Sequence, residues 1–257
     1  MTKHIEELIE KYQLNHIKDE LLRAAFDCIK VVPIRETILP VGGSKMGGSP
    51  DLPAELAYPT YKGTPLHFVA QFNLAEIQAV GIENDLPEKG MLYFFYFADD
   101  KHEDFYEVYG NPNVKEGWRV LFYEGAVEEL QKTHQMKEQY SQCRITFEKV
   151  QKLPELFIEN EDDSDRFLQL LEELIPDHYD NHQIFGTPFS VQTEVFEEAQ
   201  EFMNVHHSEM TLLFQVDSDE QHLNMMWGDM GMLYFCIASE DIKQCRFENA
   251  CCILQSL

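Results

Sequence analysis

Several short stretches contain the residue types of phosphate-binding and ligand-binding loops, and their spacing decides what they can do. The segment GGSKMGG at residues 42–48 places Ser before Lys, the reverse of the order in a phosphate-binding loop. The glycine spacing of a dinucleotide-binding turn is absent as well. We interpret the segment as a loop that lies against a sheet, with a backbone-lined ligand or partner loop as the alternative. That alternative makes Gly47, Gly48 and Pro50 candidate binding residues.

Histidine and carboxylate side chains, which are common metal ligands, gather at two places. The first is DHYDNH at residues 177–182, which follows a proline that starts a loop, and the second is HHSE at residues 206–209. Neither has a partner cluster at a recognisable spacing, and neighbouring residues of a strand point to opposite faces. We interpret both stretches as polar loop residues and expect no metal site.

The sequence also lacks the complete motifs of a calcium-binding loop, a zinc site and a serine nucleophile. DSDE at residues 217–220 would begin an EF-hand loop, but positions six and twelve are then His222 and Gly228 instead of glycine and glutamate. Cys251 and Cys252 have no Cys-x-x-Cys partner pair. The serine-hydrolase motif G-x-S-x-G is absent, whereas a Cys–His pair assembled in space stays open. We expect no cofactor, and the sequence leans against an enzyme without deciding the question.

A Met-rich segment and two glutamines are the remaining candidates. MMWGDMGM at residues 225–232 is a flexible apolar cluster, and such surfaces bind varied partners. Asp229 lies between two glycines, as in a turn, and the alternative is a packed turn in which Trp227 closes the core. Gln71 and Gln215 are either buried side chains that tie loops to a sheet or ligand contacts where two halves of the chain meet.

The elements that must position these residues follow from hydrophobic periodicity. Apolar residues at helical spacing predict helices between residues 2 and 29, at 164–175 and at 193–203. The Gly- and Pro-rich stretch 42–65 is irregular. Apolar runs predict strands at 29–38, with Pro33 arguing for a sheet edge, and at 67–73, 91–97, 118–124, 143–150, 209–217, 231–238 and 247–255.

The pentapeptide GMLYF occurs at residues 90–94 and again at 231–235. Its surroundings also correspond, with separations of 144 residues for Gln71 and Gln215, 141 for Gly90 and Gly231, and 138 for Gly48 and Gly186. Three correspondences in the same order indicate a degraded duplication, with chance recurrence of an apolar strand as the alternative. The continuous apolar runs predict strands that are buried on both faces.

These patterns predict an α+β fold. We expect mostly antiparallel sheets from two pseudo-duplicated halves, with helices on the outer faces and an N-terminal helical segment. The chain is predicted to form one globular domain, residues 1–257, with sub-halves at about 30–150 and 151–257. The helices within residues 2–29 are expected to pack on the first half.

The charge balance limits the partners. The 257 residues include 46 acids and 20 bases, a formal net charge of −26. Such a field repels phosphate backbones and anionic membranes, so we expect neither nucleic acid nor membrane as a partner. It favours a basic protein partner, although solubility alone also explains it. Six scattered cysteines and an acidic first segment without an export signal predict a cytoplasmic location. The oligomeric state stays open.

A series of short motifs follows the glycine-rich loop: G-G-x-P-x-L-P, an aromatic–Pro pair, a strand that ends in Q-[IF]-N-L, and L-P-x-x-G-x-L-x-F-F. The residues that carry them are Gly47, Gly48, Pro50, Leu52, Pro53, Tyr58, Pro59, Gln71, Asn73, Leu74, Leu86, Pro87, Gly90, Leu92, Phe94 and Phe95. In this pattern the chain resembles the YwqG-like bacterial family of unknown function. Tyr58 stands where the family usually has Trp. The resemblance implies an α+β fold and no activity.

Two functions follow as hypotheses. The first is a non-enzymatic accessory protein, of the toxin-neutralising type, that docks a basic protein on its acidic surface. Between Glu155 and Asp180 lie ten acids and one base, Arg166. The second is a small-ligand binder or hydrolase with a cleft between the two halves, lined by residues 42–65 and 225–232. The sequence favours the first.

Overall fold

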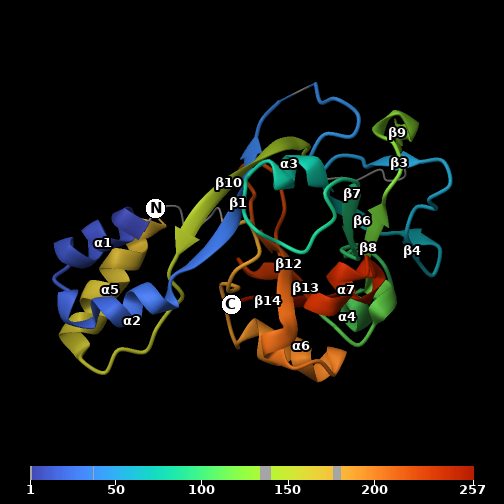
Figure 1. Cartoon of the computed structure of the whole chain (residues 1–257). Helices are drawn as coiled ribbons and strands as arrows, with labels where there is room; N and C mark the ends of the chain where they lie inside the picture. Colours follow the sequence, from blue (N-terminus) through green and yellow to red (C-terminus); the bar gives the residue numbers. More distant parts are fainter. Residues whose placement is uncertain (1, 37, 134–139, 176–180) are drawn as a thin grey trace.

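The computed structural model describes residues 2–36, 38–133, 140–175 and 181–257 and has two parts (Figure 1). The larger part is a strongly curved sheet with short helices around it. The smaller part, here called the helical lobe, consists of α1 (Thr2–Lys11), α2 (Lys18–Ala24) and α5 (Glu161–Leu174). The lobe lies beside one end of the long strands β1 (Phe26–Ile34) and β10 (Cys143–Lys152). The α+β class is therefore confirmed.

Ten strands form one sheet, and all the strand pairings among the described residues of this sheet are antiparallel. The order is β14-β13-β12-β11-β1-β10-β2-β6-β7-β8. The remaining bounds are β2 Lys45–Met46, β6 His67–Asn73, β7 Met91–Tyr96, β8 Trp118–Tyr123, β11 Gln183–Ile184, β12 Met210–Asp217, β13 Met232–Ala238 and β14 Cys251–Gln255.

Short elements complete this part of the chain. Two small two-stranded sheets pair β3 (Asp51–Pro53) with β9 (Leu130–Lys132) and β4 (Thr60–Tyr61) with β5 (Thr64–Pro65). The helices are α3 Leu74–Gln78, α4 Phe105–Val108, α6 Val195–Met203 and α7 Ser239–Lys243, with single 3-10 turns at Asn15–Ile17, Lys115–Gly117, Val127–Glu129, His207–Glu209 and Phe247–Asn249.

The central strand β1 corrects two predictions. The helical stripe predicted up to residue 29 ends at Ala24, because FDCIKVVPI is rich in β-branched residues and forms a strand from Phe26. Pro33 does not mark a sheet edge, since β1 lies between β10 and β11. The two-residue strand β11 pairs only with Ile29 and Lys30. Pro33 therefore lies beyond the end of β11, so its missing N–H does not cost a hydrogen bond to that strand.

The two GMLYF strands, β7 and β13, are buried along their whole length, as their continuous apolar runs predict. The sheet curls so that β6 and β7 face β12 and β13 across one core. The aromatic rings of Phe72 and Phe214 lie 4.7 Å apart there, and those of Phe94 and Phe235 lie 5.0 Å apart. The opposite faces of β7 and β13 pack in two separate clusters, one of which α6 covers. Aromatic side chains thus fill the space between the two sides of the sheet.

The helical lobe has its own core, which corrects the expected packing of the N-terminal helices. Ile5, Leu8 and Leu21 are buried with Phe167 and Leu170 of α5, so α1 and α2 pack on α5 and not on the first half of the sheet. An ion pair of 2.7 Å joins His16 Nε2 to Asp163 Oδ2, and Lys11 pairs with Glu173. The acidic helix therefore uses part of its charge within the molecule.

Helix α5 begins earlier than the periodicity indicates. It starts at Glu161 instead of 164, and Asn160 caps it by accepting a hydrogen bond of 3.0 Å from the backbone N–H of Asp163. Three acids in its first turn, Glu161, Asp162 and Asp163, suit the positive end of the helix dipole. Among the residues that the structure describes, no helix has the length and apolarity that a bilayer crossing requires.

Candidate functional site

The predicted binding residue Gln71 is buried in a junction, here called the Gln71 junction, that fastens residues 42–53 to the sheet. Its Oε1 accepts a hydrogen bond of 2.8 Å from the N–H of Asp51, and its Nε2 donates to Gly43 O and Asp51 Oδ2, both at 2.9 Å. Lys45 Nζ lies 2.9 Å from Asp51 Oδ1, and both side chains are essentially inaccessible. Burial lowers the pKa of Lys45, and Asp51 opposes that shift. The polar side chains of this junction are therefore bonded to one another and shielded from solvent.

Gly47 and Gly48 lie with residues 140–142, and their N–H groups are occupied. Gly47 N–H donates to Val69 O at 2.9 Å, and Gly48 N–H donates to Tyr140 O at 2.8 Å. Both have a positive φ, and a Cβ on Gly47 would come within 2.2 Å of Ser141 O. The loop is therefore packed against the neighbouring chain, and these N–H groups do not form a cradle for a phosphate. Pro50 is buried beside them, and its carbonyl accepts a bond of 3.0 Å from Thr133 N–H.

Tyr58 is half-buried and packs edge-on against Phe95, with ring centroids 5.3 Å apart. Its hydroxyl donates to Leu66 O at 3.0 Å, and burial raises its pKa well above the ordinary value. It lines a shallow hollow with Leu52, Pro53 and Leu56. The hollow does not reach residues 225–232.

Gln215 forms a second junction, here called the Gln215 junction, on the other side of the sheet. Its Oε1 accepts a hydrogen bond of 2.8 Å from Phe189 N–H, and its Nε2 donates to Asn181 O at 2.8 Å. Tyr234 donates its hydroxyl to Phe189 O at 2.6 Å. Strands β11, β1, β10 and β2 lie between the strands of Gln215 and Gln71 in the sheet order. The two glutamines thus serve different loops and do not share a site.

Trp227 is fully buried, as the packed-turn interpretation of residues 225–232 predicts. Its Nε1 donates to Asp217 O at 3.2 Å, and its ring meets Tyr96 and Tyr140 edge-on. Met225 is buried as well, so the segment does not form a broad methionine surface. Asp229 is exposed, and its carbonyl accepts a bond of 3.1 Å from Leu257 N–H.

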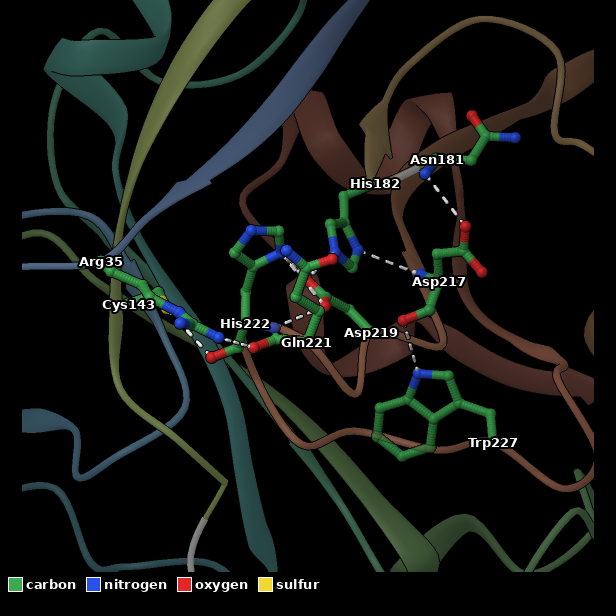
Figure 2. A network of polar contacts seen from close by, with 9 residues as sticks. All are labelled: Arg35, Cys143, Asn181, His182, Asp217, Asp219, Gln221, His222 and Trp227. Carbon is green, nitrogen blue, oxygen red and sulfur yellow. Dashed lines mark hydrogen bonds and ion pairs between the residues drawn. The ribbon is translucent and has the colours of Figure 1, made fainter. Parts of the chain in front are cut away.

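A buried polar network that the sequence did not reveal surrounds Asp219 (Figure 2). Asp219 Oδ1 accepts a bond of 2.8 Å from His222 N–H, its Oδ2 lies 3.0 Å from His222 Nδ1, and His182 Nε2 lies 3.6 Å from Oδ2. His182 Nδ1 accepts a bond of 3.1 Å from the N–H of Asp217, so the proton of neutral His182 sits on Nε2 and points toward Asp219. Burial acts to raise the pKa of Asp219, but the nearby His182 ring and the hydrogen bonds from His222 outweigh it and hold that pKa below its usual value.

The network contains a cysteine beside a histidine, but the arrangement does not activate the thiol. Cys143 Sγ donates to the backbone carbonyl of His222 at 3.3 Å. Burial raises the pKa of Cys143, so the thiolate that a nucleophile requires is disfavoured. Arg35 binds the carbonyl of Gln221 on the outer side. Within the described ranges, no group of three His, Cys, Asp or Glu residues has the geometry to hold a metal ion.

The network corrects the interpretation of DHYDNH as polar loop residues, and it involves DSDE, which the sequence only excluded as an EF-hand loop. His182, from DHYDNH, and Asp219, from DSDE, are buried and face each other. Asp177, His178 and Asp180 of the first stretch lie outside the described residues. In HHSE, by contrast, His206 and His207 are exposed, as predicted. The signal available in the sequence was the acid–histidine composition of both stretches, but their proximity arises only when β11 pairs with β12.

One cavity, here called the lobe pocket, lies between the helical lobe and the sheet. It has a volume of about 360 Å³. Its walls come from α5, from the end of β10 and from the loop after β11, and its lining consists of Phe26, Lys152, Leu153, Pro154, Glu155, Leu168, Leu171, Glu172, Ile175, Asn181, Gln183, Thr187, Pro188, Phe189, Ser190 and Glu194. None of these residues was a candidate from the sequence.

A polar corner in the lobe pocket joins it to the buried network. Lys152 Nζ donates to Asn181 Oδ1 and, at 2.7 Å, to Gln183 Oε1. Asn181 N–H in turn donates to Asp217 Oδ2 at 3.0 Å, and Asp217 binds His182. The polar lining is therefore held in place from behind by hydrogen bonds that lead to His182, whose Nε2 lies 3.6 Å from Asp219 Oδ2.

The fold and the site together define an α+β protein with one large antiparallel sheet and a preformed pocket of small-molecule size. The chain belongs to the family described as Domain of unknown function (DUF1963), whose model matches residues 44–256. No curated protein matches the chain. The match includes α5 and the sheet from β2 onward, while α1, α2 and β1 precede it.

Proposed function

We propose that this protein is a non-enzymatic binding protein that holds a small ligand in the lobe pocket. The observation that carries the proposal is the pocket itself, about 360 Å³ in volume, with mostly apolar walls and one polar corner at Lys152, Asn181 and Gln183. Ligand sites in proteins are commonly concave, largely apolar and of about 300–1,000 Å³, with a few polar groups that fix orientation.

The chemistry of the lining supports binding over catalysis. No histidine or cysteine is among the described residues that line the pocket. Ser190 Oγ accepts a long bond, 3.4 Å, from Val195 N–H, and no histidine is among the described residues that line the pocket with it. A nucleophile without an adjacent base or a lowered pKa is weak.

A dye that fluoresces in apolar surroundings tests the proposal. N-phenyl-1-naphthylamine is neutral, and we expect saturable binding to the purified protein. Leu168→Trp should weaken it about tenfold, because Leu168 lines the pocket, is half exposed and leaves room for a larger ring. Gln169→Trp is the matched control, since Gln169 is exposed on the same helix and does not line the pocket. Equal binding by both variants contradicts the proposal.

We also propose that the sheet descends from a duplicated half, and matched contacts support this. Gln71 and Gln215 make the same kinds of hydrogen bond. Gln71 accepts from Asp51 N–H and donates to Gly43 O, and Gln215 accepts from Phe189 N–H and donates to Asn181 O. Tyr93 and Tyr234 then donate to the carbonyls of Asp51 and Phe189. Two irregularities also match, a β-bulge after Phe68 and after Leu212, and consecutive positive φ angles at Gly47–Gly48 and Phe185–Gly186.

The sheet order supports the same proposal and adds an exchange of strands. Read from either end, the order places three long strands, then a two-residue strand, then a long central strand. The first strand of each half pairs with the short strand of the other: β1 with β11, and β10 with β2. The path from β1 to β2 is short, whereas the path from β10 to β11 contains α5. The lobe pocket therefore lies where the second half carries an addition.

A second candidate function is the docking of a basic protein on the acidic surface. It is favoured by the net charge of −26 and by Glu161, Asp162 and Asp165, which are exposed on α5. Affinity capture at low and at high salt tests it, with a Lys-substituted triple variant of these acids as the control. Loss of a partner at high salt and in the variant would support docking, and a partner insensitive to both would contradict it.

The accessory, toxin-neutralising role and the YwqG-like resemblance remain proposals within this frame. We propose a cytoplasmic location because the six described cysteines are free thiols and five of them are buried. The acidic field also leads us to propose that nucleic acid is not a partner.

A further inference from the structure

We infer that the ligand of the lobe pocket has an apolar body with an anionic group at one end and a cationic group at the other, as a short apolar peptide does. The inference rests on the proposed function and adds the chemical class of the ligand. It follows from the order of charges along the pocket.

Lys152, a basic residue, lies at the buried end of the pocket. Lys152 is 7% exposed, and its Nζ is held by the amide oxygens of Asn181 and Gln183, which also line the pocket. Gln183 Nε2 donates to Phe185 O and Thr187 O, so the amide cannot rotate without losing two bonds. An anionic group that reaches this corner meets a cation in partly desolvated surroundings, where charge-assisted hydrogen bonds are strong.

The walls between the corner and the surface are apolar. Leu153 is buried, Leu171 and Ile175 are half-buried, and Phe26 faces the same space from β1. At the mouth, Leu168 and Phe189 remain 50% and 36% exposed. An apolar ligand body would cover these two side chains, and burial of apolar surface is the main favourable contribution to such binding.

The rim of the pocket carries negative charge. Glu155, Glu172 and Glu194 line the pocket and are all exposed, in contrast to Lys152. A cationic group at the outer end of the ligand would lie near these carboxylates. The net charge of −26 acts in the same direction, because a simple anion is repelled on approach and a zwitterion is not. A ligand with both charges therefore fits the pocket better than a fatty-acid-like anion.

Displacement of N-phenyl-1-naphthylamine by four compounds tests this inference. The dipeptide Leu-Leu has both charges, Leu-Leu-amide lacks the anion, N-acetyl-Leu-Leu lacks the cation, and hexanoate is a simple anion. We expect Leu-Leu to displace the dye at the lowest concentration. The amide should require about tenfold more, because it loses the charge-assisted bonds at Lys152.

Lys152→Met tests the corner from the protein side. It should weaken Leu-Leu about tenfold and leave Leu-Leu-amide unchanged. Lys149→Met is the matched control, since Lys149 lies on the same strand, is exposed and pairs with Asp27. If Lys152→Met fails to fold, the four compounds on the unmodified protein still decide the question.

Three outcomes separate the inference from the function on which it rests. The expected ranking, Leu-Leu before the three others, supports both. Dye binding that Leu168→Trp weakens, with hexanoate as effective as Leu-Leu, overturns the inference and retains the ligand pocket. Dye binding that ignores Leu168→Trp overturns the pocket itself.

Discussion

The Gln71 and Gln215 junctions share the same set of hydrogen bonds but differ in the residues beside them. Both hold a loop to the sheet by a buried glutamine and a tyrosine. In the first, Lys45 and Asp51 form an ion pair within the junction. In the second, Gln183 and Phe189 occupy the corresponding places, and the cation, Lys152, comes from β10. The comparison teaches that one frame can be sealed by an internal ion pair or opened into a pocket by an added helix.

The largest effect is expected from Asp51→Ala, which breaks the sealed junction. The change leaves Lys45 buried without its carboxylate and removes an acceptor for Gln71. Removing one partner of a buried pair typically costs about 3–5 kcal/mol, and we expect that loss in the free energy of unfolding by urea.

Asp104→Ala is the control for this change, because Asp104 forms an exposed ion pair with Lys62. It should leave the urea midpoint nearly unchanged. The double variant Lys45→Met/Asp51→Leu removes both charges and should recover much of the loss. A small effect of Asp51→Ala would mean that the first junction is not held by its ion pair.

Alanine at one glycine in each of the two loops sharpens the comparison. Gly47 and Gly186 both have positive φ, but an added Cβ meets backbone in the first case, Ser141 O at 2.2 Å, and a side chain in the second, the Phe26 ring at 2.4 Å. A ring can move and a packed backbone cannot. We expect Gly47→Ala to cost more than about 2 kcal/mol and Gly186→Ala about 1–2 kcal/mol in urea unfolding. The reverse order would show that the second loop is the more rigid one.

The two glutamines provide the next test. Gln71→Ala and Gln215→Ala each leave a backbone N–H and a backbone carbonyl, buried or partly buried, without these side-chain partners. Each should cost about 1–3 kcal/mol, and similar values would support the proposal that the junctions share an origin. Gln151→Ala, on the half-buried part of β10, is a control of the same residue type. A near-zero value at only one junction would contradict the equivalence.

The smallest effect concerns pH and has no counterpart at the Gln71 junction. The pKa of Asp219 is lowered in the folded state, whereas an aspartate in the unfolded chain has a pKa of about 3.9. Asp219 therefore stabilises the fold at pH values above the unfolded pKa, and this contribution is lost as the pH falls through the lower folded value. Asp219→Asn should be less stable than the unmodified protein at pH 6, and the difference should shrink toward pH 3.

Urea unfolding measured at several pH values checks this prediction, with the exposed Asp100→Asn as control. A difference that stays constant with pH would assign Asp219 a purely structural role.

Most strands of the sheet could be predicted because each has a clear local hydrophobic pattern. The continuous apolar runs at β7 and β13, and the helical stripe of α5, depend on local sequence and were located to within a few residues. Strand β1 was mistaken in part for helix because Ala25 and Ile29 continue the spacing of the preceding helix by coincidence. No local signal reports that β10 will supply a strand partner to it 110 residues later.

The site was far less predictable. For Trp227 and the glutamines the sequence left both a structural role and a binding role open, and it could not distinguish one junction from the other. Lys152 ends an ordinary strand, and nothing near it in the sequence marks it as a pocket residue. Its neighbours Asn181 and Gln183 reach it only after α5 has folded back onto the lobe, and such tertiary proximity leaves no trace in spacing.

The central position of β1 has a consequence for synthesis on the ribosome. Both of its sheet partners, β10 and β11, are encoded far downstream, so this strand emerges early and finds no neighbour until residue 143 has been made. Cys28, Ile29 and Val31 are buried in the folded protein, but without these partner strands they remain exposed to solvent until the partners are synthesised. A nascent chain with an unpaired, β-branched segment is prone to associate with other chains. Because the partners of β1 are translated late, correct folding of this strand depends on the second half of translation.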